Sequence, residues 1–140
     1  MKETISYWKK KVWTVFSLFI RLKYANKKGY SRCVTCGKLY FYKRLQAGHF
    51  IPGRHNAVLF NEDVVYPQCY SCNFFLYGNP RGFDKFMRDK YGDEKVKEFD
   101  KLAKGLRGNT KQFTIKELEE LYKHYKKESD KLLKNLGNYE

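Results

Sequence analysis

The chain has 140 residues, of which 42% are hydrophobic and 18% aromatic, a composition that predicts one globular domain and excludes a disordered chain. Its formal net charge of +14 is large for this length and predicts an anionic partner, most commonly nucleic acid. The excess lies in the amino-terminal third, because residues 1–44 hold 12 Lys/Arg and a single acid, whereas residues 45–140 hold 17 Lys/Arg and 14 acids. A charged face that is merely solvated is the alternative interpretation.

Residues 5–25 are predicted to form the first helix. The apolar run "VWTVFSLFI" is too short to span a bilayer, and no small-residue cleavage site follows it, so we expect a cytoplasmic protein with no membrane partner. The apolar face is wider than one stripe, which favours burial against the rest of the domain or against a second subunit over a membrane-surface helix. The residues at helical spacing are Trp8, Val12, Val15, Phe16, Phe19 and Leu22.

Residues 30–80 are predicted to form a compact core. The stretch "KLYFYKRLQAGHFI" favours a strand or hairpin that ends near His49, and "PGRHN" is a loop. The stretches "AVLF" and "DVVYPQ" are expected to be extended. A helix is predicted from the second cysteine pair to about Tyr77, where "GNPRG" ends it and Asn79 forms part of the stop.

Residues 81–140 are predicted to be helical. One helix ends at Gly92 and another at Gly105, and residues 107–114 form a linker. Thr114 is the expected cap of the last helix, with Glu117 three residues further on. We therefore expect a single domain over 1–140, made of a helix over 5–25, a metal-bound core over 30–80 and a helical part over 81–140.

Two Cys-x-x-Cys pairs are separated by 32 residues. In a reducing compartment such pairs usually bind zinc, and four thiolates complete a tetrahedral shell, so the predicted metal is structural. Two disulfides are the alternative. The predicted zinc ligands are Cys33, Cys36, Cys69 and Cys72.

His49 lies between the two pairs, and Asn73 follows the last cysteine directly. An imidazole can take a proton from water, and an amide oxygen can bind Mg²⁺ or Mn²⁺, a combination that suits hydrolysis of a phosphodiester bond. The alternative is a histidine satisfied in the core and an asparagine that only caps a turn. Because zinc half-sites flank both residues, we favour the catalytic interpretation.

The stretches "CVTCGK", "LQAGHF" and "NEDVVYPQCYSCNFFLYGN" together resemble the phage NinG (Rap) recombination endonucleases, which belong to the HNH or His-Me finger nucleases. The Cys-x-x-Cys-Asn frame is also similar to that of phage endonuclease VII. The core of the resemblance covers about residues 30–92, and it extends to "FSLFIRLKYA" upstream and, more loosely, to the last helix. It implies an α+β fold with a zinc-stabilised ββα-metal core flanked by amino- and carboxy-terminal helices, His49 as general base and Asn73 as ligand of the catalytic Mg²⁺ or Mn²⁺. It also implies a phage or prophage protein in the bacterial cytoplasm.

The sequence departs from the broad nuclease pattern in two places. Many relatives have Asp or His before the base, as a second metal ligand, where this chain has Gly48. Gln46, His55 and Glu62 are the candidates for that role. The central Asn of HNH proteins has no obvious counterpart, and Asn56 and Asn61 are the candidates.

Several basic residues are candidate nucleic-acid contacts, with simple solubility as the alternative. His55 touches phosphate in one interpretation and is merely exposed in the other, and His124 is expected to be solvated. Tyr40, Phe41 and Tyr42 are candidates to stack on unpaired bases or to pack in the core. The predicted DNA contacts are Lys27, Lys28, Arg32, Lys43, Arg44, Arg54 and His55.

Taken together, these features predict a metal-dependent endonuclease that cuts branched recombination intermediates such as Holliday junctions and D-loops. A junction has approximate two-fold symmetry and needs two cuts, so a homodimer held by the first or last helix is a further hypothesis. Two rivals remain. One is a nicking or non-specific nuclease with the same chemistry, and the other is a zinc module that binds DNA without cutting it.

Overall fold

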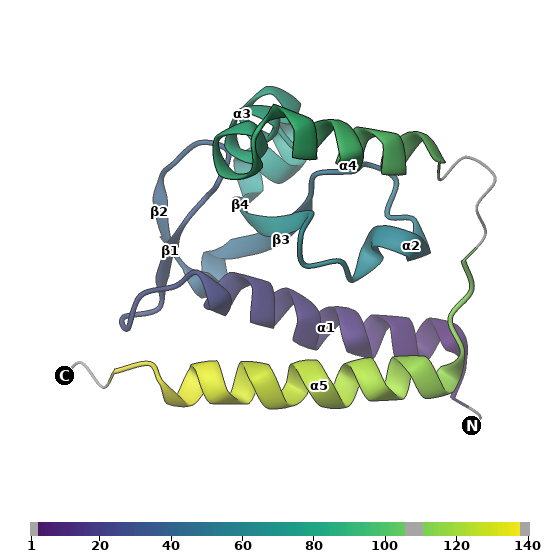
Figure 1. The fold of residues 1–140 in the computed structure, drawn as a ribbon. Coiled ribbons are helices and arrows are strands. Elements are labelled where there is room, and N and C mark those ends of the chain that lie inside the picture. Colours follow the sequence, from purple (N-terminus) through teal and green to yellow (C-terminus); the bar gives the residue numbers. More distant parts are fainter. Residues whose placement is uncertain (1–2, 106–110, 138–140) are drawn as a thin grey trace.

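We describe the fold from a computed structural model, and the description extends over residues 3–105 and 111–137. It is a mixed α+β structure in which two small antiparallel sheets lie among helices (Figure 1). None of the helices in these ranges is long and apolar enough to cross a membrane. The elements in chain order are α1 (Ile5–Lys23), β1 (Tyr30–Arg32), β2 (Leu39–Phe41), η1 (Tyr42–Arg44), β3 (Leu45–His49), α2 (Asn56–Leu59), β4 (Val65–Cys69), η2 (Ser71–Phe75), α3 (Pro80–Tyr91), α4 (Asp93–Gly105) and α5 (Ile115–Lys134).

Helix α1 forms where the apolar spacing predicted a helix, and it ends at Lys23, two residues before the predicted end. Its first turn is capped by Thr4, whose hydroxyl accepts a hydrogen bond from the backbone N–H of Tyr7 at 3.1 Å. All six residues of the predicted stripe are buried, together with Ile20. The prediction that this helix packs in the core is therefore confirmed.

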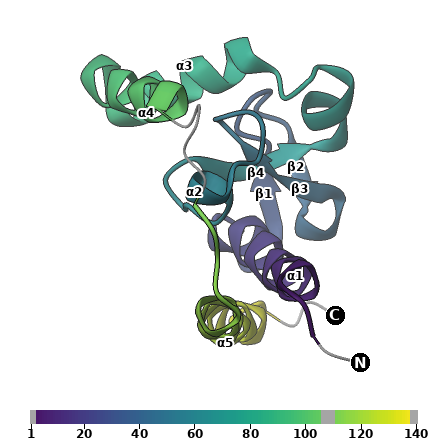
Figure 2. The same ribbon diagram turned by 90° about the vertical axis from the view of Figure 1, so that its right-hand side faces the viewer.

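The width of the apolar face of α1 is explained by the two neighbours that the helix has. Helix α5 runs beside α1 in the same direction, and the β3–β4 sheet lies on the other side of α1 (Figures 1 and 2). The Tyr125 ring packs edge-on against Phe16, with 4.9 Å between ring centroids, and Tyr122 packs against Trp8. This part of α1 is thus covered within one chain.

The β3–β4 hairpin carries the predicted site. The strands pair antiparallel from Leu45↔Cys69 to His49↔Val65, so the strand predicted to end near His49 ends at that residue. Because the register is fixed at Leu45 and Cys69, the second cysteine pair begins where β4 ends. Strands β1 and β2 form a separate hairpin whose connection holds the first pair, Cys33 and Cys36.

Two segments differ from the predictions. The stretch "AVLF", predicted to be extended, instead begins in α2, a single helical turn that buries Val58 in one hydrophobic cluster and Leu59 in another. Asn79 does not stop the preceding helix: it caps α3, and its side chain accepts from the Gly82 N–H at 3.2 Å.

The carboxy-terminal helices follow the predicted boundaries. Helix α3 is capped by Gly92, and α4 extends to Gly105. The Thr114 hydroxyl accepts from the Glu117 N–H at 3.1 Å, so the predicted cap of the last helix is confirmed. Residues 106–110 of the predicted linker lie outside the described residues.

Candidate metal centre and cavity

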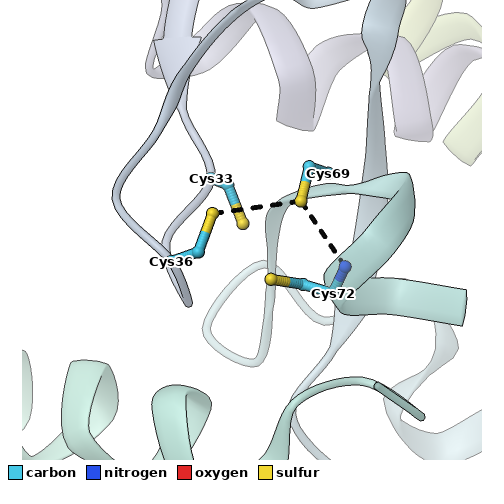
Figure 3. A group of neighbouring side chains, drawn as sticks. All are labelled: Cys33, Cys36, Cys69 and Cys72. Carbon is cyan, nitrogen blue, oxygen red and sulfur yellow. Dashed lines mark hydrogen bonds between the residues drawn. The ribbon is translucent and has the colours of Figure 1, made fainter. Parts of the chain in front are cut away.

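The four cysteine sulfurs converge on one point (Figure 3). Every pair of sulfurs lies within 4.8 Å, and the Sγ atoms of Cys36 and Cys69 are 3.9 Å apart. All four cysteines are free thiols, and a disulfide would need about 2.05 Å between sulfurs. A tetrahedral zinc with Zn–S bonds of about 2.3 Å places its sulfurs about 3.8 Å apart. The cluster therefore fits a structural zinc ion and not two disulfides.

The electrostatics of the cluster also fit a cation. Although burial raises the pKa of the Cys33 thiol, hydrogen bonds from Thr35 and from backbone N–H groups outweigh burial and lower the pKa to about 6. Desolvation and the neighbouring thiols raise the pKa of Cys36 to about 12, and burial also raises the pKa of Cys72. Four thiolates this close repel one another, and a divalent cation removes that repulsion.

The cluster joins the two hairpins to the helical turn that carries Asn73. Cys33 and Cys36 come from the β1–β2 connection, Cys69 ends β4, and Cys72 lies in η2. The η2 turn is π-helical, with the Leu76 N–H donating to the Ser71 carbonyl at 3.0 Å. The four cysteines therefore fasten two antiparallel hairpins and one helical turn together at a single point.

His49 is held in one orientation by two contacts. Its Nε2 atom lies 3.1 Å from the carbonyl oxygen of Leu59, and its ring stacks on Trp13 at a centroid distance of 5.2 Å. A carbonyl oxygen only accepts hydrogen bonds, so Nε2 carries the proton and the lone pair lies on Nδ1. Burial lowers the pKa of His49, the charge of Arg54 lowers it further, and the Leu59 carbonyl partly opposes them. His49 is therefore a neutral imidazole near pH 7.

Asn73 points toward β3. Its Nδ2 atom donates to the Oε1 atom of Gln46 at 2.7 Å. Because the amide nitrogen is used in this way, the amide oxygen of Asn73 remains the atom available to a cation or another donor. The sequence suggested Gln46 only as a candidate metal ligand. In the structure, Gln46 instead accepts this hydrogen bond and thereby orients the Asn73 amide.

Gly48 is required by the packing of a neighbouring side chain. A Cβ atom at this position would lie 1.8 Å from Oε1 of Gln68, which is fully buried. The Gln68 amide nitrogen donates to Thr35 and to the carbonyl of Gly78, so Gln68 links β4 to the cysteine loop and to the end of the η2 region. No carboxylate or imidazole fits at position 48, because Gln68 occupies that space.

The other candidates for a second metal ligand are bound elsewhere or lie apart. Glu62 accepts from the Tyr125 hydroxyl at 2.9 Å and pairs with Lys23, so its carboxylate stabilises the contact between α1 and α5. His55 is an exposed residue that precedes α2 and packs against Gly53. Of the two candidate loop asparagines, Asn56 bonds to Lys9 and to the Lys111 carbonyl, whereas Asn61 caps the turn before β4.

Asn73 and Gln46 line a cavity of about 370 Å³ together with Arg21 and Arg54. Neither arginine forms an ion pair among the described residues; Arg21 donates to the carbonyls of Ser17 and Tyr42 at 3.2 Å each. Burial lowers the pKa of Arg21 from its ordinary value, but an arginine stays charged at neutral pH. The cavity thus offers two cationic side chains and two amides, which are groups that bind phosphate.

A second cavity of about 800 Å³ adjoins the first, because Trp13 and Arg54 line both. It is bounded by Lys9 and Lys10 of α1. The Arg54 guanidinium lies 4.4 Å from the centroid of the Trp13 ring, and the same ring stacks on His49. The two cavities therefore form one basic surface along α1. Asn73 lines the smaller cavity, whereas His49 lines neither and contacts this surface through the Trp13 ring.

Other predicted DNA contacts lie at varying distances along the chain from this surface. Arg54 lines both cavities, whereas the exposed Lys43 and Arg44 directly precede the lining residue Leu45. Lys27 and Lys28 follow the end of α1, and Arg32 donates to the Gly37 carbonyl at 2.8 Å beside the cysteine loop. Of the seven predicted DNA contacts, Arg54 alone lines either of these two cavities.

Sequence reasoning missed Arg21 and Trp13 as parts of the site. Arg21 follows Lys10, Thr14 and Ser17 on the polar face of α1, and this spacing was the available signal. Of the three aromatic residues predicted either to stack on bases or to pack in the core, Tyr42 is buried, and Tyr40 and Phe41 are half-buried. The most exposed aromatic rings of the described residues lie on and around η2.

One comparison with known proteins identifies a family. The family model described as "Bacteriophage Lambda NinG protein" matches residues 1–136. No curated protein and no solved structure matches the chain, so similarity to HNH nucleases and to endonuclease VII stays a prediction. Since the family model covers nearly the whole chain, this protein belongs to the NinG family of phage proteins related to recombination.

Proposed function

We propose that this protein is a metal-dependent endonuclease that hydrolyses phosphodiester bonds in branched DNA, in the cytoplasm of a bacterial host. The observation that carries the proposal is the orientation of His49. With Nε2 bonded to the Leu59 carbonyl, the neutral ring presents the Nδ1 lone pair as a general base. Membership of the NinG family supports branched recombination intermediates as the substrate class.

In the proposed reaction, His49 removes a proton from the water that attacks the scissile phosphorus, and the 3′ oxygen leaves. Arg21 and Arg54 hold the phosphate oxygens in the cavity. A Mg²⁺ or Mn²⁺ ion held by the amide oxygen of Asn73 would stabilise the charge on the phosphate and on the departing oxygen. Gln46 keeps that amide oriented. One amide oxygen is a weak site, so substrate phosphate and waters would complete the ligand set.

Cleavage of a synthetic four-way junction with Mg²⁺ or Mn²⁺ tests the proposal, with wild type and His49→Ala compared and DNA binding measured in parallel. We expect the variant to bind as wild type does and to cut about 10²- to 10⁴-fold more slowly. Flap and linear duplex substrates in the same assay separate a branch-specific enzyme from a nicking or non-specific nuclease. If wild type cuts none of these substrates, the proposal is wrong.

A non-catalytic zinc module that only binds DNA is the second candidate. One observation favours it: the residues that line the 370 Å³ cavity include no carboxylate. This candidate predicts binding of DNA without metal-dependent cutting. The homodimer stays a hypothesis within either candidate, since two cuts across a junction suit two copies. Sedimentation as a monomer even with junction DNA would remove it.

A further inference from the structure

Among the described residues, five of the six large apolar side chains that are at least 50% exposed gather on and around η2. They are Tyr70, Phe74, Phe75, Leu76 and Tyr77, with between 50% and 92% of each residue exposed, and we call them the η2 patch. Tyr70 and Phe74 stack with 5.2 Å between centroids and 7° between planes, and Phe75 packs edge-on against both. A contiguous exposed apolar surface of this kind marks an interaction site.

The local backbone explains why these rings face outward. The cluster needs Cys69 and Cys72 on the inside, and Asn73 lines the cavity, so the wide π-helical turn leaves the intervening and following rings outside. Tyr77 has a φ of +52°, a left-handed conformation that is uncommon for a bulky residue, and it is 92% exposed. Tyr77 therefore combines an unfavourable backbone conformation with a fully accessible apolar ring.

The charge around the η2 patch indicates the kind of partner. Residues 64–83 contain no Asp or Glu, and residues 4–83 contain only Glu62 and Asp63 against thirteen Lys/Arg. The register Leu45↔Cys69 makes the exposed Arg44 and Tyr70 the next residues outward on the two chain segments. Flat rings with a cation beside them suit nucleobases joined to a phosphate backbone. A polyanion is a more favourable occupant of this patch than a second copy, which carries the same formal charge of +14.

We infer that the η2 patch is a stacking platform for unpaired nucleobases of DNA. The inference rests on the proposed function for its biological setting, because Asn73 places the patch directly beside the proposed phosphate cavity. Bases that are unpaired at a branch point would stack on Phe74 and Phe75 while the adjoining backbone enters that cavity. Ordinary duplex, whose bases are already stacked and paired, would not use the patch.

The test compares binding of a dT12 single strand and of a linear duplex, with no Mg²⁺ or Mn²⁺ added and no chelator, so that zinc is retained. The double variant Phe74→Leu/Phe75→Leu keeps the patch apolar but removes the rings, and Phe74→Tyr/Phe75→Tyr keeps the rings. We expect the Leu pair to weaken single-strand binding by about tenfold or more and to leave duplex binding unchanged. The Tyr pair and the control Tyr30→Leu, an exposed aromatic on β1, should bind as wild type does.

A second measurement reports on stacking directly. A dT single strand with one central 2-aminopurine should lose fluorescence when wild-type protein stacks on that base, and the Leu pair should cause little or no loss. Equal single-strand affinity of wild type and the Leu pair, or no quenching by wild type, overturns the inference. The sedimentation of the protein without DNA provides the alternative outcome. If the Leu pair changes the oligomeric state while Tyr30→Leu does not, and DNA affinity is unchanged, the patch is a protein interface instead. Because no cutting is measured, binding through the patch in a protein that does not cleave would contradict only the proposed function.

Discussion

The Nε2 atom of His49 lies 3.1 Å from the carbonyl oxygen of Leu59, ten residues further along the chain. This one contact selects the tautomer of the imidazole, because the carbonyl can only accept. It also joins the end of β3 to α2, so the short helical turn that was not predicted supplies the group that orients the predicted base.

The pH dependence of cleavage should reflect the lowered pKa of His49. Since burial lowers the pKa of this group below its ordinary 6.5, more than half of the imidazole is neutral at pH 6.5. We expect the single-turnover rate to level off near neutral pH and to fall in acid, with the midpoint of that fall below pH 6.5. A rising limb centred above pH 7 would contradict the assignment.

The same shift has a consequence for stability. The unfolded chain binds a proton at His49 more readily than the folded chain does, so the free energy of unfolding falls as pH falls below about 6.5. His49→Gln removes this titration. Urea unfolding measured between pH 7.5 and pH 5 should therefore show a larger decrease in the free energy of unfolding for wild type than for the variant. Acid also acts on the cysteine cluster, but that effect is the same in both proteins and cancels in the comparison.

Gln46 should act as a positioning residue for Asn73. Gln46→Ala removes the acceptor at 2.7 Å and frees the Asn73 amide to rotate, so we expect about tenfold slower cleavage and a higher requirement for Mg²⁺ or Mn²⁺. Gln46→Glu keeps an acceptor at this position and should recover most of the rate. Unchanged metal dependence in Gln46→Ala would show that Asn73 does not need this contact.

Metal analysis should find one zinc ion per chain. Replacing a buried ligand, as in Cys33→Ser, should remove zinc and unfold residues 30–80 at 37 °C, because metal binding supplies folding free energy on the order of 10 kcal/mol in small zinc modules. Circular dichroism and zinc content measure both effects. Ser31→Ala, which alters a buried residue that is not a ligand, is the matched control.

Gly48→Ala should be strongly destabilising, by about 1–3 kcal/mol or more, since the added Cβ would lie 1.8 Å from Gln68 Oε1. The double variant Gly48→Ala/Gln68→Ala removes the obstructing atoms. We expect its loss to be smaller than the sum of the two single losses, a coupling that chemical denaturation of all four proteins measures. Additive losses would mean that the two side chains do not share space.

Arg54 should contact a DNA phosphate. Arg54→Gln is expected to reduce the slope of log affinity against log salt concentration by about one, uniformly across sequences. Lys126→Gln is the matched control, because Lys126 is paired with Asp130 on α5 and lines neither cavity beside α1. Equal slopes for wild type and Arg54→Gln would place the phosphate elsewhere.

The sequence by itself determined the features that depend on local spacing: the apolar stripe of α1, the two Cys-x-x-Cys pairs, the strand that ends at His49 and the Thr114 cap. Each follows from backbone periodicity or from a short motif. Only the tertiary structure decided which side chains meet. Gln46 and Asn73 are 27 residues apart, and Arg21 and Arg54 share one cavity because α1 packs on the hairpin. The sequence also did not reveal that the η2 rings are exposed, because apolar side chains favour the core in general. Their position here is set by the turn that brings Cys69 and Cys72 into the cysteine cluster.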